Sequence, residues 1–310
     1  MISSGISLRN WLLFGLLSFI WGSSFILMKA GLTALHPYQV GAIRMVSGGL
    51  VLLPLAFMQL RRYSISTIGL ILLSGLLGSF FPAYLFCIAE TRLDSSLAGF
   101  MNAFTPLITI CLGIIFFKKE IPRHKIGGVI IGFCGMLLLL LAAETVDITY
   151  LSYAGFVLLA VLCYAININL VSRYLSHVSP IHIAAIGFSL LLPVSLIILV
   201  STGYFDLPLS NADYLFASTA GAVLGVLGTA VATVIFYILI KNAGVVFSSM
   251  VTYGVPFIAL GWGLIAGDSM TLLQVLGLVV ILSGVYLTNR NGTAQKKDEL
   301  LPESPGRDPL

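Results

Sequence analysis

Long apolar runs recur along the whole chain and restrict the folds that it can adopt. The first, from Trp11 to Leu32, is followed by others of similar length, separated by short polar stretches. A helix of about 20 apolar residues crosses the hydrocarbon core of a bilayer, which is about 30 Å thick. The composition agrees, since 58% of the residues are hydrophobic and 9% are charged, whereas soluble domains have about 25% charged residues. The sequence therefore predicts an all-α polytopic membrane protein.

The lengths of these runs and the breaks between them predict ten transmembrane helices. Each break contains polar residues, Pro or Gly, as in HPYQ, KKEIPRHK and YFDLPLSNAD. The connections are short, so neighbouring helices are expected to be antiparallel. The first run is longer than the apolar core of a signal peptide and lacks a clear cleavage site, so we expect it to be retained as a helix. The expected spans are 11–32, 38–58, 66–89, 95–117, 125–143, 151–172, 181–201, 213–240, 245–267 and 270–288.

Positive charges are divided unequally between the two sides of this arrangement, which predicts its orientation. When successive connections are assigned alternately to two sides, Arg92 is the only Lys or Arg in the connections of one side. Lys and Arg in short loops favour the cytoplasm, so we expect a multi-pass protein of the cytoplasmic (inner) membrane with both termini in the cytoplasm. The basic pI then requires no nucleic-acid partner. The other side has Arg9, Arg61, Arg62, Lys118, Lys119, Arg123, Lys125, Arg173, Lys241, Arg290, Lys296, Lys297 and Arg307.

The chain divides into two related halves and a tail. A shift of 143 residues pairs Trp21 with Tyr164, and a shift of 150 residues pairs Gly78 with Gly228. Each half has five helices, an odd number, so the second half enters the membrane from the opposite side. Inverted repeats are typical of secondary transporters. The expected units are a first five-helix repeat, 1–143, a second five-helix repeat, 151–290, and a polar cytoplasmic tail, 291–310, whose composition predicts disorder.

Several motifs, in this order and in duplicate, resemble those of a known family. The first repeat has WGSSF followed by Lys29, AIR ending at Arg44, and TPLITICLGIIFFKKEIP, and the second has YGVPFIALGWGLIAGDSM and LGLVVILSG. Over 8–290 the chain resembles the drug/metabolite transporter superfamily and, within it, the EamA-type ten-helix carriers. The resemblance implies a cavity lined mainly by helices 1, 3, 4, 6, 8 and 9, and small polar or amphipathic cargo, often amino acids. GDS at the end of the ninth helix departs from the glutamate that is usual in the family.

Polar and aromatic side chains at mid-membrane depth form the candidate binding site. A polar side chain that faces lipid is costly, so such groups are expected to face a cavity or another helix. At about 100° per residue, Trp21, Phe25 and Lys29 share one face of the first helix, and Thr233 and Tyr237 belong to a polar stripe of the eighth. The proposed substrate-binding residues are Trp21, Ser24, Phe25, Lys29, Arg44, Tyr84, Asn102, Tyr164, Asn167, Thr233, Tyr237, Thr252 and Tyr253.

These residues also have structural alternatives, which the sequence leaves open. Ser and Thr hydroxyls can bond back to their own helix and mediate packing. Asn102 and Asn167 can form interhelical hydrogen bonds, and Trp21 and Tyr164 can pack against neighbours without contacting cargo.

Two cations, Lys29 and Arg44, are expected about 10 Å below the outer surface, at a rise of about 1.5 Å per residue. Side chains tilt toward the N-terminus of their helix, so Arg44 can snorkel to the interface, whereas Lys29 is directed deeper. The second repeat has Ser172 and Gly187 at these positions, so the fold does not require the charges. We therefore expect Lys29 to face the outer part of the cavity and attract an anionic group. Pairing with Glu90 is the alternative.

The sequence favours a secondary transporter, an exporter or exchanger that works by alternating access. A small-solute channel or facilitator and a lipid-handling membrane protein are the alternatives. The chain has no H-E-x-x-H, nucleophile-elbow or P-loop motif, so we expect neither an enzyme nor a cofactor, and its His and Cys positions predict no metal site. No Asp, Glu or His lies near the middle of a span, so strict proton coupling is not expected, and Glu90 is the nearest candidate. The expected partners are a small molecule and the lipid bilayer. The oligomeric state, monomer or homodimer, is open.

Overall fold

The computed structural model describes residues 6–93, 95–142, 151–265 and 271–289, which form helices joined by short turns. The tail predicted to be disordered lies outside the described residues. The first repeat contains α1 (Leu8–Leu32), α2 (Pro37–Gln59) with η1 (Leu60–Arg62), a third span made of α3 (Ile65–Gly75), η2 (Leu76–Phe80) and α4 (Phe81–Ala89), a fourth made of α5 (Ser95–Asn102) and α6 (Thr105–Ile115), and α7 (Arg123–Leu141).

The second repeat follows the same plan. It contains α8 (Leu151–Tyr174), α9 (Pro180–Ser201) with η3 (Tyr204–Asp206), an eighth span made of α10 (Ala212–Val223), η4 (Leu224–Val231) and most of α11 (Ala232–Ser249), a ninth span centred on α12 (Val251–Ile265), and α13 (Leu272–Asn289).

Local sequence explains where several helices begin. Ser7 precedes α1, and its side chain accepts a hydrogen bond from the backbone N–H of Asn10. Ser64 does the same for α3, as is usual for an N-cap residue. α2 and α9 begin with Pro37 and Pro180, whose fixed φ suits the first helical position.

Gly244 separates the eighth span from the ninth. It has φ 82° and ψ 173° in the middle of α11, a conformation that glycine adopts far more readily than other residues. The chain changes direction here, within the KNAG break that the sequence places between 240 and 245.

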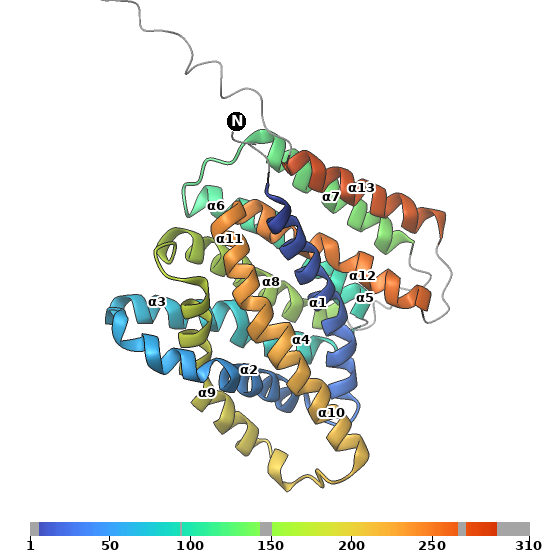
Figure 1. Cartoon of the computed structure of the whole chain (residues 1–310). Coiled ribbons are helices and arrows are strands. Elements are labelled where there is room, and N and C mark those ends of the chain that lie inside the picture. Colours follow the sequence, from blue (N-terminus) through green and yellow to red (C-terminus); the bar gives the residue numbers. More distant parts are fainter. Residues whose placement is uncertain (1–5, 94, 143–150, 266–270, 290–310) are drawn as a thin grey trace, which may run out of the picture.

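Helix packing shows the internal symmetry of the two repeats. Span 2 (α2) packs along span 7 (α9), and span 5 (α7) packs along span 10 (α13), as Figure 1 shows for the last pair. The contact of α1 with α12 has its counterpart in the contact of α8 with α6, and the contact of α4 with α8 corresponds to that of α1 with α10 and α11. Exchanging the two repeats therefore preserves the packing, and the predicted inverted five-helix repeats are confirmed.

A π-helical segment interrupts the same place in each repeat. It is η2 in the third span and η4 in the eighth, and the shift of 150 residues carries η2 into η4. The wide turns of π-helical segments are frequent at functional sites. Gly78 and Gly228 lie within these two segments and bring them close to span 6 and span 1, since an added Cβ would lie 2.9 Å from Asn167 Cγ or 2.6 Å from Ser24 Oγ.

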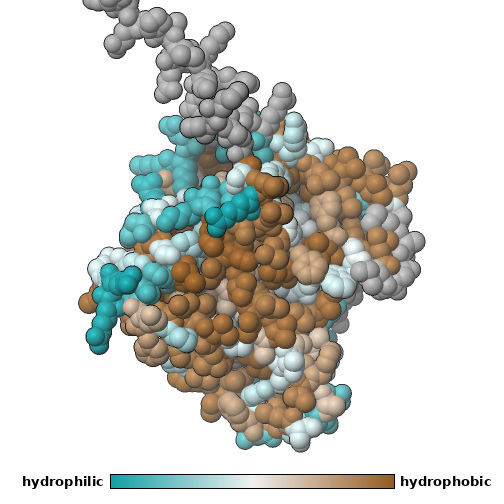
Figure 2. Space-filling view, viewed as in Figure 1, coloured by the Kyte–Doolittle hydropathy of each residue, from teal (hydrophilic) through white to brown (hydrophobic). Residues whose placement is uncertain are grey.

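The outer surface is that of a membrane protein. Figure 2 shows hydrophobic residues over most of the visible face, and hydrophilic residues gather mainly toward the end where the N-terminus lies. In the described part of the chain, nine helices are long and apolar enough to cross a membrane; one of them, Ala212–Ser249, continues past Gly244, and Val251–Trp262 is a shorter apolar helix. The kink at Gly244 reconciles this count with the ten predicted spans, and the protein is a multi-pass helical membrane protein.

Candidate substrate-binding cavity

A cavity lies between the two repeats, in the centre of the bundle. Its empty volume is about 730 Å³, counting the part that is open to solvent. Both repeats contribute to its wall. It is lined by Trp21, Ser24, Phe25, Met28, Arg44, Gly78, Phe86, Asn102, Thr105, Tyr164, Asn167, Ile168, Thr233, Phe236, Tyr237, Ser249 and Thr252.

Most of the residues proposed from the sequence line this cavity. The residues that the structure adds are mainly apolar or small: Met28, Gly78, Phe86, Thr105, Ile168, Phe236 and Ser249. Some of these had a signal in the sequence, because Phe86 pairs with Phe236 and Gly78 with Gly228 in the repeat alignment. The sequence-proposed residues in the lining are Trp21, Ser24, Phe25, Arg44, Asn102, Tyr164, Asn167, Thr233, Tyr237 and Thr252.

Lys29, Tyr84 and Tyr253 lie outside this lining. Tyr253 is fully buried, and its hydroxyl donates to the Val129 carbonyl at 2.9 Å, so it faces α7. Tyr84 packs against Phe80, with ring centroids 4.9 Å apart. Lys29 has an exposed side chain, and its charge acts on Glu90. These three side chains therefore lie on faces of their helices that turn away from the cavity lining.

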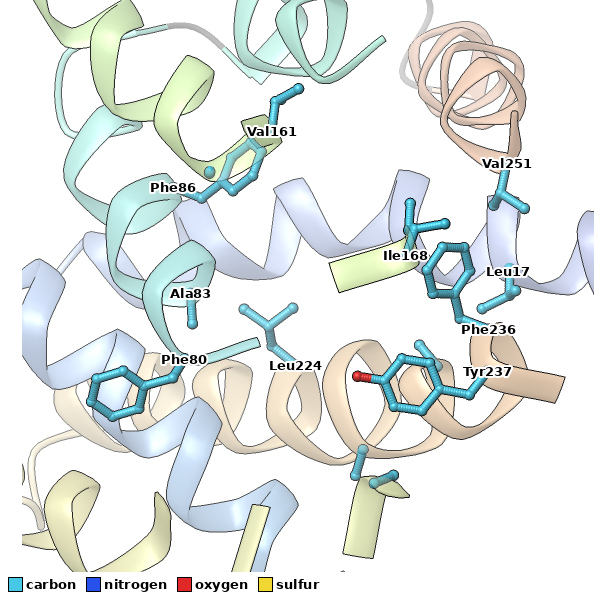
Figure 3. Close-up of a cluster of buried hydrophobic side chains, with 14 of the residues drawn as sticks. Leu17, Phe80, Ala83, Phe86, Val161, Ile168, Leu224, Phe236, Tyr237 and Val251 are labelled. Atoms are coloured by element: carbon cyan, nitrogen blue, oxygen red, sulfur yellow. The ribbon is translucent and has the colours of Figure 1, made fainter. Parts of the chain in front are cut away.

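Aromatic side chains form the middle of the cavity wall. The Trp21 indole donates to the Gly228 carbonyl at 3.2 Å and lies 5.1 Å from the Phe236 ring. The ring centroids of Phe86 and Tyr164 are 6.1 Å apart, and the two rings are stacked. Figure 3 shows Phe86 on α4, with Phe236 and Tyr237 on α11. Such rings accept the apolar part of a ligand and fix its position.

A neutral hydrogen-bonding cluster borders the cavity, which Asn167 and Tyr237 line. Ser74 Oγ donates to Asn167 Oδ1 at 2.7 Å, and Asn167 Nδ2 donates to the Tyr237 hydroxyl at 3.3 Å. Ser74 and Tyr237 are themselves 3.1 Å apart. The three side chains come from spans 3, 6 and 8, so the interhelical hydrogen bond considered for Asn167 is present. Ser74 was not proposed from the sequence, because an isolated Ser in an apolar span has no distinctive signal.

Several hydroxyls in the lining bond within their own helices. Ser24 donates to the Ile20 carbonyl at 2.7 Å, and Thr252 donates to the Ser249 carbonyl at 3.1 Å. Thr105 donates to the Asn102 carbonyl at 2.6 Å. These bonds leave the hydroxyl oxygens able to accept from a ligand, since a hydroxyl has two lone pairs.

Arg44 provides the positive charge of the lining. Its side chain is 8% exposed, and its Nε donates to the hydroxyl of Thr229 in η4. Thr229 lies eight residues before Tyr237 in span 8, or roughly 12 Å along the helix axis at about 1.5 Å per residue. The point where span 8 holds Arg44 is therefore about two helical turns from the neutral cluster.

Glu90 lies near Arg44. It follows Ala89, the last residue of the third apolar span, its side chain is 5% exposed, and both carboxylate oxygens are buried with no hydrogen-bond partner in the described part of the chain. Burial raises the pKa of Glu90 to about 8, although the charges of Lys29 and Arg44 oppose the increase. Glu90 is therefore poised to change its charge near neutral pH.

Comparison with known proteins accounts for both repeats. The model of the EamA-like transporter family matches residues 9–141 and, a second time, residues 151–290. The chain belongs to the EamA-like transporter family. The double match agrees with the two packed repeats, and the EamA-like assignment explains the motifs duplicated in the sequence.

Relatives of this EamA-like chain are named as transporters. The uncharacterized transporter YdfC of Bacillus subtilis (strain 168) is 28% identical over 277 residues and covers 87% of each chain. A probable amino-acid metabolite efflux pump of Salmonella typhimurium is 26% identical over 282 residues, covering 86% of this chain and 90% of that protein. A solved crystal structure with 16% identity has a TM-score of 0.68 and covers 90% of this chain and 96% of its own, so the fold is shared.

Proposed function

We propose that the protein is a secondary transporter, an exporter or exchanger, that moves a small polar or amphipathic metabolite such as an amino acid. The observation that carries the proposal is the central cavity, whose wall is built from both repeats. In the proposed alternating-access cycle, the two repeats exchange conformations around this cavity and expose it to each side in turn.

The names of the relatives support the choice of cargo. One is a probable amino-acid metabolite efflux pump. Another, 31% identical over 134 residues that cover 42% of this chain and 41% of that protein, is an S-adenosylmethionine/S-adenosylhomocysteine transporter of Chlamydia trachomatis. Both names point to amino acids or their derivatives. A cavity with aromatic walls and separate polar groups suits molecules of this kind.

The proposal places the protein in the cytoplasmic membrane with both termini in the cytoplasm. The support is the distribution of Lys and Arg between the two sides of the membrane. Its proposed partners are the small-molecule cargo and the lipid bilayer, as a monomer or a homodimer.

Counterflow in proteoliposomes tests the function. Vesicles that contain the purified protein are loaded with an unlabelled amino acid and diluted into a trace of the same labelled amino acid, and a panel of amino acids is screened in this way. A carrier gives transient accumulation of label, because loaded cavities exchange faster than empty ones return. A channel, or a lipid-handling protein, gives no overshoot for any cargo, and that result would contradict the proposal.

A further inference from the structure

The two repeats differ at one symmetry-related helix crossing. Span 2 crosses span 8 where Arg44 meets Gly225, and an added Cβ on Gly225 would lie 2.9 Å from Arg44 Cα. The symmetry-related crossing of span 7 with span 3 brings Gly187 to Gly75, where an added Cβ on Gly75 would lie 3.4 Å from Gly187 Cα. The backbones therefore pack alike, and the second crossing forms with glycine in the place of arginine. Packing alone gives no reason for a cation at Arg44.

The charge on Arg44 needs an anion, water or several acceptors. A guanidinium does not lose its proton in proteins, and an isolated charge buried at this depth is costly. Arg44 Nε donates to Thr229, and the Tyr164 hydroxyl lies beside the same group. A guanidinium has five N–H donors in a planar fork, so these two neighbours leave most of the donors for the cavity that Arg44 lines.

The nearby carboxylate does not occupy these donors. The charge of Arg44 acts on Glu90, yet neither carboxylate oxygen of Glu90 forms a hydrogen bond in the part of the chain that the structure describes. Among the described residues that line the cavity, none is acidic. The guanidinium is thus held in place by span 8 while its fork remains available to a ligand.

We propose that Arg44 binds the carboxylate group of an amphipathic organic acid, such as an amino acid, whose apolar part lies between the aromatic side chains. This inference rests on the proposed transport function and names its cargo class. Arginine suits the role because its planar fork matches a carboxylate in two parallel hydrogen bonds. The rings of Trp21, Phe86 and Phe236 line the adjoining wall. The Ser74–Asn167–Tyr237 cluster then faces the neutral or donor groups of the cargo.

The arrangement also links cargo to conformation. Arg44 belongs to the first repeat, and its hydrogen-bond partner Thr229 belongs to η4 in the second. A carboxylate on Arg44 therefore contacts the point where the two repeats meet. Binding at this point can favour one arrangement of the repeats over the other, provided that the carboxylate binds the two arrangements with different affinity.

Matched pairs of ligands test the proposal on the purified wild-type protein. The probes are L-phenylalanine with L-phenylalaninamide, L-leucine with L-leucinamide, and indole-3-acetate with indole-3-acetamide. Each amide keeps the apolar body and removes the carboxylate charge. We expect at least one carboxylate to bind roughly tenfold or more tightly than its amide, as measured by thermal shift and confirmed by titration calorimetry.

Variants then locate the preference. Arg44→Gln is expected to reduce carboxylate binding about tenfold or more while changing amide binding little, and Arg44→Lys to restore part of the preference. Lys241→Gln removes an exposed cation outside the cavity and is the control. Lys29→Gln distinguishes the two cations of the outer half: loss of the preference in Lys29→Gln with its retention in Arg44→Gln would overturn the proposal.

The remaining outcomes are also decisive. Equal affinity for acid and amide, or no binding by any member of the panel, overturns the proposal with the wild-type protein alone, so a variant that fails to fold does not prevent a result. Tighter binding of carboxylates without counterflow of any cargo would support Arg44 as the anion site and contradict the transport function.

Discussion

At the scale of single residues, the sequence identifies the two cations but not which of them faces the cavity. Lys29 and Arg44 are placed at the same depth by counting from Pro37. The rotation of each helix about its own axis depends on packing with helices that are distant in sequence. The backbone of Arg44 packs closely against Gly225 of span 8. This contact directs the Arg44 side chain inward, while Lys29 remains exposed. Periodicity alone could not choose between the two faces.

Glu90 gives a prediction about pH. Its pKa is raised to about 8 by burial, so the folded protein favours the protonated carboxyl. The associated stabilisation is fully present below the ordinary pKa of Glu and is lost as the pH rises through 8. The groups known to act on Glu90, namely Lys29, Arg44 and Cys87, are all retained in Glu90→Gln.

We therefore expect the wild-type protein to lose thermal stability relative to Glu90→Gln between pH 5 and pH 8, and the difference to level off above that range. Thermal unfolding of both proteins in the same detergent at several pH values measures it. Lys119, whose pKa burial lowers to about 8, titrates in both proteins and cancels in the comparison. Parallel stability curves across the whole range would show that Glu90 does not titrate there.

At the scale of helical elements, the sequence predicts the spans well and their interruptions poorly. Apolar length and polar breaks decide where a helix crosses the membrane, so predicted and observed bounds agree within a few residues. The π-helical segments η2 and η4 have no such signal. They depend on the close approach of another span to Gly78 or Gly228, which is a property of the packed bundle. The break between α5 and α6 does have a signal, because it lies just before Pro106, and proline interrupts a helix.

Gly78 is predicted to be sensitive to a single added methyl group. A Cβ there would lie 2.9 Å from Asn167 Cγ and 3.0 Å from the Tyr237 hydroxyl, within the neutral cluster. Gly78→Ala should destabilise the protein by about 1–3 kcal/mol through overpacking and weaken cargo binding. Gly69→Ala, in the same span with nothing within 4 Å, is the control and should be neutral or slightly stabilising. Equal thermal shifts for the two variants would argue against a close contact at Gly78.

Gly244 tests the backbone rather than the packing. An added Cβ would meet nothing within 4 Å, so any cost of Gly244→Ala comes from the positive φ of 82°. With ψ at 173° this is a region that is essentially restricted to glycine, and another residue there costs roughly 1–3 kcal/mol. We expect a loss of stability of about that size, measured by thermal unfolding. Gly155→Ala in α8, also without neighbours within 4 Å, lacks the positive φ and should be unaffected. A neutral Gly244→Ala would mean that the kink is not fixed by this glycine.

At the scale of the whole molecule, the duplicated motifs were sufficient to predict the architecture, because two related halves with five helices each must be inverted. The cavity follows from that symmetry, since the two repeats meet along it. The chemistry of the cavity does not follow, because it depends on where the repeats differ. The pairs Arg44 with Gly187 and Ser24 with Asn167 are related by the shift of 143 residues, yet they place a cation on one side of the axis and a neutral amide on the other.

The structure also groups the connections into two ends of the bundle. Tyr63, after α2, bonds to His182 at the start of α9 at 2.7 Å, and Lys119 bonds to Ser172 at 3.0 Å. At the opposite end, the Gln39 amide donates to the Thr202 carbonyl at 2.9 Å. The connections that the charge distribution assigns to one side are therefore adjacent in space.

Reporter fusions test which end is cytoplasmic. We expect green fluorescent protein fused after Arg62 or Arg290 to be fluorescent, which marks the cytoplasm. We expect alkaline phosphatase fused after Thr145 or Gly203 to be active, which marks the other side. The reason is that Lys and Arg in short loops keep their side of the protein in the cytoplasm. Fusions after Arg62 and Gly203 lie at the two structurally defined ends and control for each other. The same compartment for Thr145 and Arg290 would contradict the inverted arrangement of the repeats. If the fusions lie in opposite compartments but Thr145 is cytoplasmic and Arg290 is not, the fold is retained and the orientation in the membrane is reversed. Arg44 would then lie in the cytoplasmic half.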